Sequence, residues 1–224
     1  MKKVLPLFVL VVLFCVFYWS TDIDSLISGN KIKKQDTKEP ISSKEFQNGD
    51  IIFQTSKSSQ SKAIQLATHS DYSHMGIVYE TDGRYFVYEA VQPVKLTPLD
   101  QWIRRGLNGH YVVKRLKNAD QVLTKRTLAK MKQVGERYKG KSYDLYFEWS
   151  DDKIYCSELV WKIYKEAANI EIGELERLAD FDLSPKVVQQ KMRERYGTNV
   201  PVNEQVISPV AMFDSNKLMT VRVE

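Results

Sequence analysis

Cys156 is the residue whose type and surroundings most directly suggest chemistry. The chain has 224 residues and two cysteines, and the other one, Cys15, lies in an apolar segment near the N-terminus. Cys156 therefore has no partner in its own region for a structural disulfide. A free cysteine is either a small buried apolar residue or a nucleophile, since a thiolate attacks carbonyl carbon. The residue type alone leaves both interpretations open.

The residues after Cys156 predict a helix that begins at the cysteine. Apolar side chains recur on one helical face, at Leu159, Val160, Ile163, Tyr164 and Ala167. The same spacing turns Cys156 toward the core. Unpaired N–H groups at a helix start stabilise a thiolate, and they also stabilise the oxyanion that forms during acyl transfer. The position of Cys156 thus suits a nucleophile.

A cysteine nucleophile needs a base, and His74 is the best candidate among the three histidines. It directly precedes residues 75–78 (Met-Gly-Ile-Val), an apolar run that predicts a strand and would hold the imidazole in place. His69 and His110 lie in polar turn sequences. The alternative for His74 is a histidine that only satisfies hydrogen bonds at the end of a strand.

Glu89 is the candidate that would orient His74. It is a carboxylate within the apolar segment 85–91, and the turn at 81–84 predicts a hairpin between this segment and the strand that His74 begins. A buried charge costs free energy unless it has a partner, and a histidine base needs an acceptor on its second nitrogen. The alternative is a strand residue that faces outward.

Other kinds of site are disfavoured. His69, Asp71 and His74 match no closed zinc spacing, and no Gly-x-Ser-x-Gly elbow occurs for a serine nucleophile. We expect no metal and no cofactor. The net charge is +5 and no basic stripe is interleaved with aromatic residues, so we expect no nucleic-acid partner.

The periodicity along the chain predicts a mixture of antiparallel strands and helices. Besides the hairpin and the Cys156 helix, the expected strands are 51–54, 111–116 and 218–223, and the expected helices are 61–68, 124–138 and 187–196.

The N-terminus resembles an export signal. Lys2 and Lys3 precede an uncharged run at 4–19, and no Ala-x-Ala site ends it, which favours an uncleaved anchor over a cleaved signal peptide. Cys15 is then an apolar residue of this segment. The lysines place the rest of the chain on the extracytoplasmic side of the membrane, or make it secreted if the signal is cleaved. We predict a signal at 1–20, a polar tether at 21–45 and a globular domain at 46–224.

Four motifs resemble one known family. They are residues 48–53 (Asn-Gly-Asp-Ile-Ile-Phe), 73–78 (Ser-His-Met-Gly-Ile-Val), 88–90 (Tyr-Glu-Ala) and the stretch from Tyr143 to Val160. As a set they are similar to the permuted NlpC/P60 proteins of the papain-like superfamily, of the YiiX/YaeF type. The match runs from about Phe46 to Ala168. His74 precedes Cys156, the reverse of the order in ordinary papain-like enzymes, as a circular permutation implies.

The resemblance implies an α+β fold in which an antiparallel sheet or small barrel packs against helices. It implies a triad of Cys156 as nucleophile, His74 as base and then acid, and Glu89 as orienting residue, with Tyr143 as a donor to the oxyanion. The implied activity is that of a cysteine peptidase or amidase, with a cell-wall peptide or a lipid-linked amide as substrate. A lipid acyltransferase or thioesterase with the same nucleophile, and a non-catalytic module that binds lipid or peptide, are the alternatives.

Overall fold

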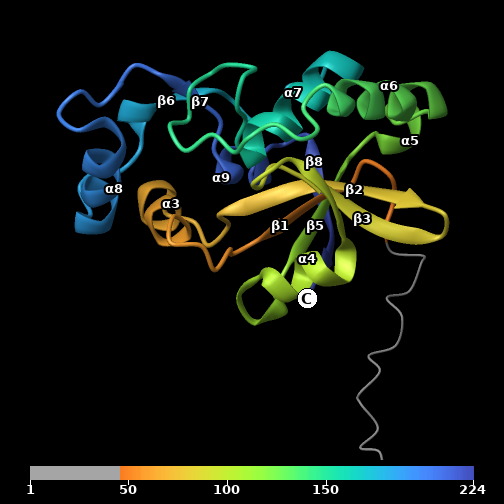
Figure 1. Cartoon of the computed structure of the whole chain (residues 1–224). Helices are drawn as coiled ribbons and strands as arrows, with labels where there is room; N and C mark the ends of the chain where they lie inside the picture. The colour runs from red at the N-terminus through yellow and green to blue at the C-terminus, as the bar shows by residue number, and fades with distance from the viewer. Residues whose placement is uncertain (1–45) are drawn as a thin grey trace, which may run out of the picture. The chain divides into compact units, whose positions relative to one another are not determined.

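A six-stranded antiparallel sheet organises the computed structural model, which describes residues 46–224 (Figure 1). The strand order is β4-β3-β2-β1-β5-β8, so β4 and β8 form the edges and the sheet is open. The strands are β1 Ile51–Gln54, β2 His74–Thr81, β3 Arg84–Glu89, β4 Lys95–Pro98, β5 Val112–Leu116 and β8 Leu218–Val223.

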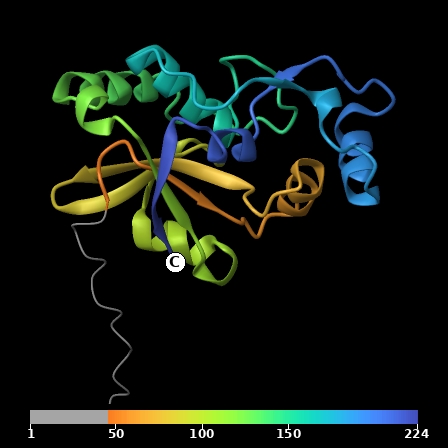
Figure 2. The ribbon, with the colours of Figure 1, turned by 180° about the vertical axis from the view of Figure 1, so that it is seen from behind.

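The central strands are buried because helices cover both faces of the sheet. All four residues of β1 are buried, as are the first six of β2. Helices α6 (Lys125–Glu136) and α7 (Cys156–Ala168) lie on one face, and α4 (Leu99–Arg105) lies on the other, as the two opposite views agree (Figure 2). This burial explains the nearly continuous apolar runs of β1 and β2.

Helix α7 is the main packing partner of the sheet. Its residues Leu159, Val160, Ile163 and Tyr164 are buried in one cluster with Met75 and Ile77 of β2. At its start the backbone N–H of Tyr155 donates to Glu158 Oε2 at 3.4 Å. This bond caps the start of α7 at Cys156.

A second group of elements lies beyond the end of the sheet at which β2 begins (Figure 1). Helix α3 (Ser61–Thr68) contacts α8 (Lys186–Tyr196), and the two-stranded pair of β6 (Glu176–Arg177) and β7 (Gln205–Val206) lies nearby. The remaining short elements are η1 Leu107–Gly109, α5 Ala119–Val122, η2 Leu178–Asp180 and α9 Pro209–Phe213.

The predicted elements are confirmed with small shifts at their ends. The hairpin, the other three strands and the four helices all form, and the α+β class is correct. Strand β3 ends at Glu89 and not at 91, and α6 begins after Thr124, whose side chain caps it by accepting from the Thr127 N–H at 3.2 Å. The periodicity did not predict β4, α4, α9 or the β6-β7 pair. Of the two forms that the fold prediction allowed, the structure has the antiparallel sheet, since β4 and β8 are its edges among the described strands.

The predicted N-terminal signal and tether, including Cys15, lie outside the described residues. Among residues 46–224 no helix is both long enough and apolar enough to cross a membrane.

Candidate active site

Cys156 is the first residue of α7 and is buried, with 2% of its surface exposed. It is a free thiol. Its sulfur accepts hydrogen bonds from the backbone N–H groups of Met75 and Ser157, so one donor comes from the sheet and one from the helix start. The predicted helix start is confirmed, and it directs two peptide dipoles at the sulfur.

His74 is the first residue of β2 and contacts both of its expected neighbours. Its Nε2 lies 2.6 Å from Glu89 Oε2, and its ring also hydrogen-bonds the Cys156 side chain. Since Nε2 is engaged by Glu89, Nδ1 is the nitrogen that remains for the sulfur. Trp102 of α4 stacks on the imidazole, with ring centroids 5.9 Å apart and an interplanar angle of 26°. The ring is therefore fixed at both nitrogens and on one face.

Glu89 is fully buried at the end of β3, so the outward-facing interpretation is wrong. Its Oε1 accepts hydrogen bonds from Thr97 Oγ1 and from Arg105 Nη2, each at 2.5 Å. Thr97 belongs to β4 and Arg105 to α4. These two donors, together with His74, compensate the cost of burying the carboxylate.

Gly76 permits the close approach of β2 and β3 beside this carboxylate. A Cβ at this position would lie 2.4 Å from Val87 Cγ1 and 2.7 Å from the Tyr88 carbonyl oxygen, and 3.3 Å from Glu89 Cβ. Any larger residue would push the two strands apart. The glycine two residues after His74 thus keeps the imidazole and the carboxylate within hydrogen-bonding distance.

The surroundings favour a charged pair of thiolate and imidazolium. Burial alone would raise the pKa of the Cys156 thiol, but the hydrogen bond and the charge of His74 bring that pKa below its ordinary value. Burial alone would lower the pKa of His74, but its hydrogen bonds to Cys156 and Glu89 raise that pKa to about 9. Burial alone would raise the pKa of the Glu89 carboxyl, but His74, Thr97 and Arg105 together bring that pKa below its ordinary value. The imidazolium of His74 thus stabilises the negative charges of Cys156 and Glu89, and they stabilise it.

Tyr143 also hydrogen-bonds the Cys156 side chain. Burial, followed by the negative charge of Cys156, raises the pKa of the Tyr143 hydroxyl well above its ordinary value, so the phenol stays protonated and able to donate. Its backbone N–H donates to Gln92 Oε1 at 2.7 Å, which anchors the segment before α7. All four predicted site residues thus lie together.

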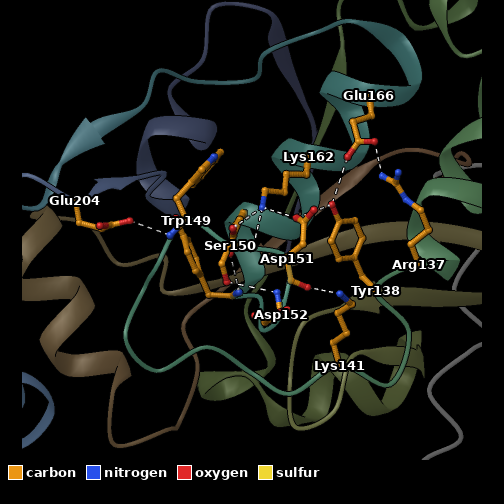
Figure 3. A network of polar contacts seen from close by, with 12 residues as sticks. Arg137, Tyr138, Lys141, Trp149, Ser150, Asp151, Asp152, Lys162, Glu166 and Glu204 are labelled. Carbon is orange, nitrogen blue, oxygen red and sulfur yellow. Dashed lines mark hydrogen bonds and ion pairs between the residues drawn. The ribbon is translucent and has the colours of Figure 1, made fainter.

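A polar network holds the loop between Tyr143 and α7 (Figure 3). Lys162 Nζ lies 2.8 Å from Asp151 Oδ1 and 2.9 Å from Glu158 Oε1, and the Tyr138 hydroxyl donates to the same Asp151 oxygen at 3.2 Å. The backbone N–H of Trp149 donates to Glu204 Oε1 at 2.9 Å. The loop is thereby tied both to α7 and to the chain before β7.

An apolar pocket opens at Cys156. It is partly open to solvent, and Tyr143, Ser157 and Arg195 are among the residues that line it. Most other lining side chains are apolar and come from α3, from α8 and from the segments around β6 and β7: Ala63, Ile64, Ala67, Leu178, Phe181, Leu183, Val188, Met192, Val206, Ile207 and Pro209. Sequence analysis did not predict this pocket, because most of its wall comes from residues beyond Ile170.

The other histidines lie away from these groups. His69 is the left-handed residue that ends α3 and its side chain lies 3.4 Å from Asp182, and His110 follows η1. Within the described part of the chain no cluster of three or more His, Cys, Asp or Glu residues could hold a metal ion.

Comparisons with known proteins show which family this chain is similar to. Residues 45–222 match the model of a family described as permuted papain-like amidase enzymes, YaeF/YiiX, C92 family. The chain is 53% identical over 178 residues to the uncharacterized protein YiiX of Escherichia coli (strain K12), which covers 80% of this chain and 87% of the relative.

A solved structure is also similar to this chain. It is the crystal structure of YiiX from Escherichia coli O157:H7, described as a metalloprotein, with a TM-score of 0.77, 53% identity, and coverage of 80% of this chain and 98% of that one. In residues 46–224 of the present chain, the His, Cys, Asp and Glu side chains form no group that fits a metal ion. The proposed reaction therefore uses protein side chains and no metal.

Proposed function

Because the chain belongs to the permuted papain-like amidases of the YaeF/YiiX (C92) family, we propose that it is a cysteine hydrolase that cleaves an amide bond through an acyl-enzyme on Cys156. The observation that carries the proposal is the arrangement of His74, whose Nε2 lies 2.6 Å from Glu89 while its ring also hydrogen-bonds Cys156. A nucleophile, a base and an orienting carboxylate in this order are the parts that covalent acyl transfer requires.

The first half-reaction begins with the Cys156 thiolate. Its sulfur attacks the amide carbonyl carbon, and the negative charge moves to the carbonyl oxygen, which is stabilised by N–H groups at the start of α7 and by the Tyr143 hydroxyl. Collapse of this intermediate breaks the C–N bond. The His74 imidazolium donates its proton to the leaving nitrogen, so an amine departs and a thioester remains on Cys156.

The second half-reaction uses the neutral His74. The imidazole accepts a proton from water, the hydroxide equivalent attacks the thioester carbonyl, and the C–S bond breaks to release a carboxylic acid and the thiolate. Glu89 does not exchange a proton in either step. It holds the ring in one orientation and stabilises the imidazolium each time it forms.

The apolar pocket favours a second candidate, an acyltransferase or thioesterase that acts on lipids. A pocket lined mainly by aliphatic side chains suits a hydrocarbon chain better than a polar cell-wall peptide. The acyl-enzyme would be the same in this case. In a thioesterase, a thiol leaves in place of the amine. In an acyltransferase, an alcohol or an amine attacks the acyl-enzyme in place of water.

Intact-protein mass spectrometry separates these candidates. The protein is mixed with acyl amides of increasing chain length, with cell-wall peptides and with acyl thioesters, and both the adduct on Cys156 and the released acid are measured. We expect an adduct of the acyl mass and release of acid from at least one amide. Adducts from thioesters alone would contradict amide hydrolysis and support the second candidate.

Substitution of Ala67 with Phe tests whether the pocket holds the acyl chain. Ala67 lies on α3 and lines the pocket, and the added ring fills space that a long chain would occupy. We expect kcat/KM for long-chain acyl substrates to fall about tenfold or more, while that for acetyl substrates, the internal control, stays nearly unchanged. Equal losses for both chain lengths would contradict an acyl-binding role.

We also propose that residues 1–20 attach the protein to the membrane, with the catalytic domain on the extracytoplasmic side, or secreted if the signal is cleaved. The support is the sequence pattern of Lys2 and Lys3 before an uncharged run. Recovery of the full-length chain, of unchanged mass, from the soluble cell fraction would contradict this proposal.

A further inference from the structure

A row of hydrogen bonds leads from the end of α8 to the Cys156 sulfur. Arg195 Nη2 donates to Gln60 Oε1 at 2.6 Å, and Gln60 Nε2 donates to the Tyr143 hydroxyl oxygen at 3.3 Å. Tyr143 in turn hydrogen-bonds Cys156. Gln60 is the buried residue that precedes α3, so three segments far apart in the chain meet at this row.

Arg195 determines the direction of every bond in the row. A guanidinium carries only donors, so the group facing it must be the Gln60 carbonyl oxygen, and the Gln60 NH₂ must face Tyr143. The Tyr143 oxygen is then an acceptor in that bond. Its own hydrogen is left for the other neighbour, which is the sulfur of Cys156. Reversal of the amide would place two donors against each other at Arg195.

The packing of Arg195 keeps it in this position. Its guanidinium carbon lies 5.2 Å from the centre of the Phe147 ring, on the same loop that carries Tyr143. Helix α8 also contacts α3 directly. Helix α8 is thus connected to the sulfur through Arg195, Gln60 and Tyr143.

We propose that Gln60 and Arg195 are positioning residues that make the Tyr143 hydroxyl an obligatory donor toward Cys156, first to the thiolate and then to the oxyanion. The oxyanion part rests on the proposed acyl-transfer function, whereas the thiolate part does not. Hydrogen bonds to a charged acceptor are stronger than bonds between neutral groups, so the direction of this one hydroxyl affects both the free thiolate and the reaction.

Substitution of Gln60 with Glu tests the direction. The side chain keeps its size and its contact with Arg195, but both of its oxygens accept, so the Tyr143 hydrogen turns away from the sulfur. We expect the pKa of Cys156 to rise, and both the iodoacetamide alkylation rate at about pH 6 and kcat/KM to fall about 10- to 100-fold. KM should change little. Gln121→Glu, the same change at an exposed position on α5, is the matched control and should leave both rates unchanged.

A double-mutant cycle separates the direction of the hydroxyl from the added charge. If Gln60→Glu acts through Tyr143, then Gln60→Glu combined with Tyr143→Phe should be no slower than Tyr143→Phe alone. Effects that multiply, or a Gln60→Glu variant as reactive as the wild type, would overturn the proposal.

If Gln60→Glu does not fold, variants of Arg195 provide a second test of the same proposal. Arg195→Met frees the amide to rotate and should slow alkylation, while Arg195→Lys retains a donor and should restore most of the rate. Equal rates for the two variants would overturn the proposal. Alkylation needs no substrate, so these results stand even if no amide proves to be cleaved.

Discussion

Replacement of Cys156 with alanine is expected to lower kcat/KM for amide hydrolysis about 10⁴-fold or more, because it removes the only thiol among the described residues. The other three site residues remain in place, so substrate binding should persist. The measurement is the rate of acid release, together with the loss of the acyl adduct in the intact mass. The alanine removes a single buried sulfur atom, and its free energy of unfolding should change by only about 1 kcal/mol.

Cys156→Ser is the matched control for shape. It keeps a polar atom at the start of α7, but an alcohol is far less acidic than a thiol, and His74 would have to remove its proton during attack. We expect at most a trace of activity. Turnover of either folded variant within about tenfold of the wild type would contradict a thiolate mechanism.

Replacement of Glu89 with glutamine is expected to lower kcat/KM about 10²- to 10⁴-fold. The amide has the same shape but no charge, so the imidazolium loses its main stabilising partner. The pKa of His74 should then fall from about 9, and the pKa of Cys156 should rise from its lowered value. The thiolate and the imidazolium coexist only between the pKa of Cys156 and the pKa of His74. The acid limb of the pH profile should therefore move to higher pH, and the alkaline limb to lower pH.

The pH profiles of kcat/KM and of alkylation measure these shifts. Asp100→Asn is the matched control, since Asp100 is an exposed carboxylate on the same helix as Arg105 and pairs with Arg104 at 2.7 Å. It should leave both profiles unchanged. A Glu89→Gln variant with lower activity but unmoved pH limbs would show that Glu89 supports only the fold.

The residues nearest the chemistry were predictable from the sequence because each interrupts a strong pattern. Cys156 begins a helix with regular apolar spacing, His74 begins a strand, and Glu89 is a charge in an apolar run. Long buried elements give clear periodicity, and residues at their ends are easy to place. The order of His74 and Cys156 also indicated a permuted topology.

The partners of Glu89 and the pocket were not predictable in the same way. Thr97 lies on a four-residue edge strand that ends in Pro98, and Arg105 ends a seven-residue helix, so neither element is long enough for a clear period. A possible signal was the spacing of Leu99 and Trp102, both buried. Part of the pocket wall comes from α8, which is polar on its outer face and forms the wall only because it packs against α3.

Gln60 and Arg195 also escape sequence reasoning, because neither belongs to a recognisable motif and their contact spans much of the chain. Only the folded structure shows that the guanidinium faces the amide. Their role depends on the direction of hydrogen bonds, which has no counterpart in composition or periodicity.

The most direct test of the central claim is the pH dependence of Cys156 alkylation by iodoacetamide, measured in a Cys15→Ser background so that one thiol reacts. An ordinary thiol with a pKa near 8.5 gains about 75-fold in rate between about pH 6 and about pH 8. We predict a gain of less than about tenfold for Cys156, because the hydrogen bond and the charge of His74 lower the pKa of its thiol. The ratio is independent of how easily the reagent enters the pocket. A gain as steep as that of an ordinary thiol would contradict an activated nucleophile at Cys156.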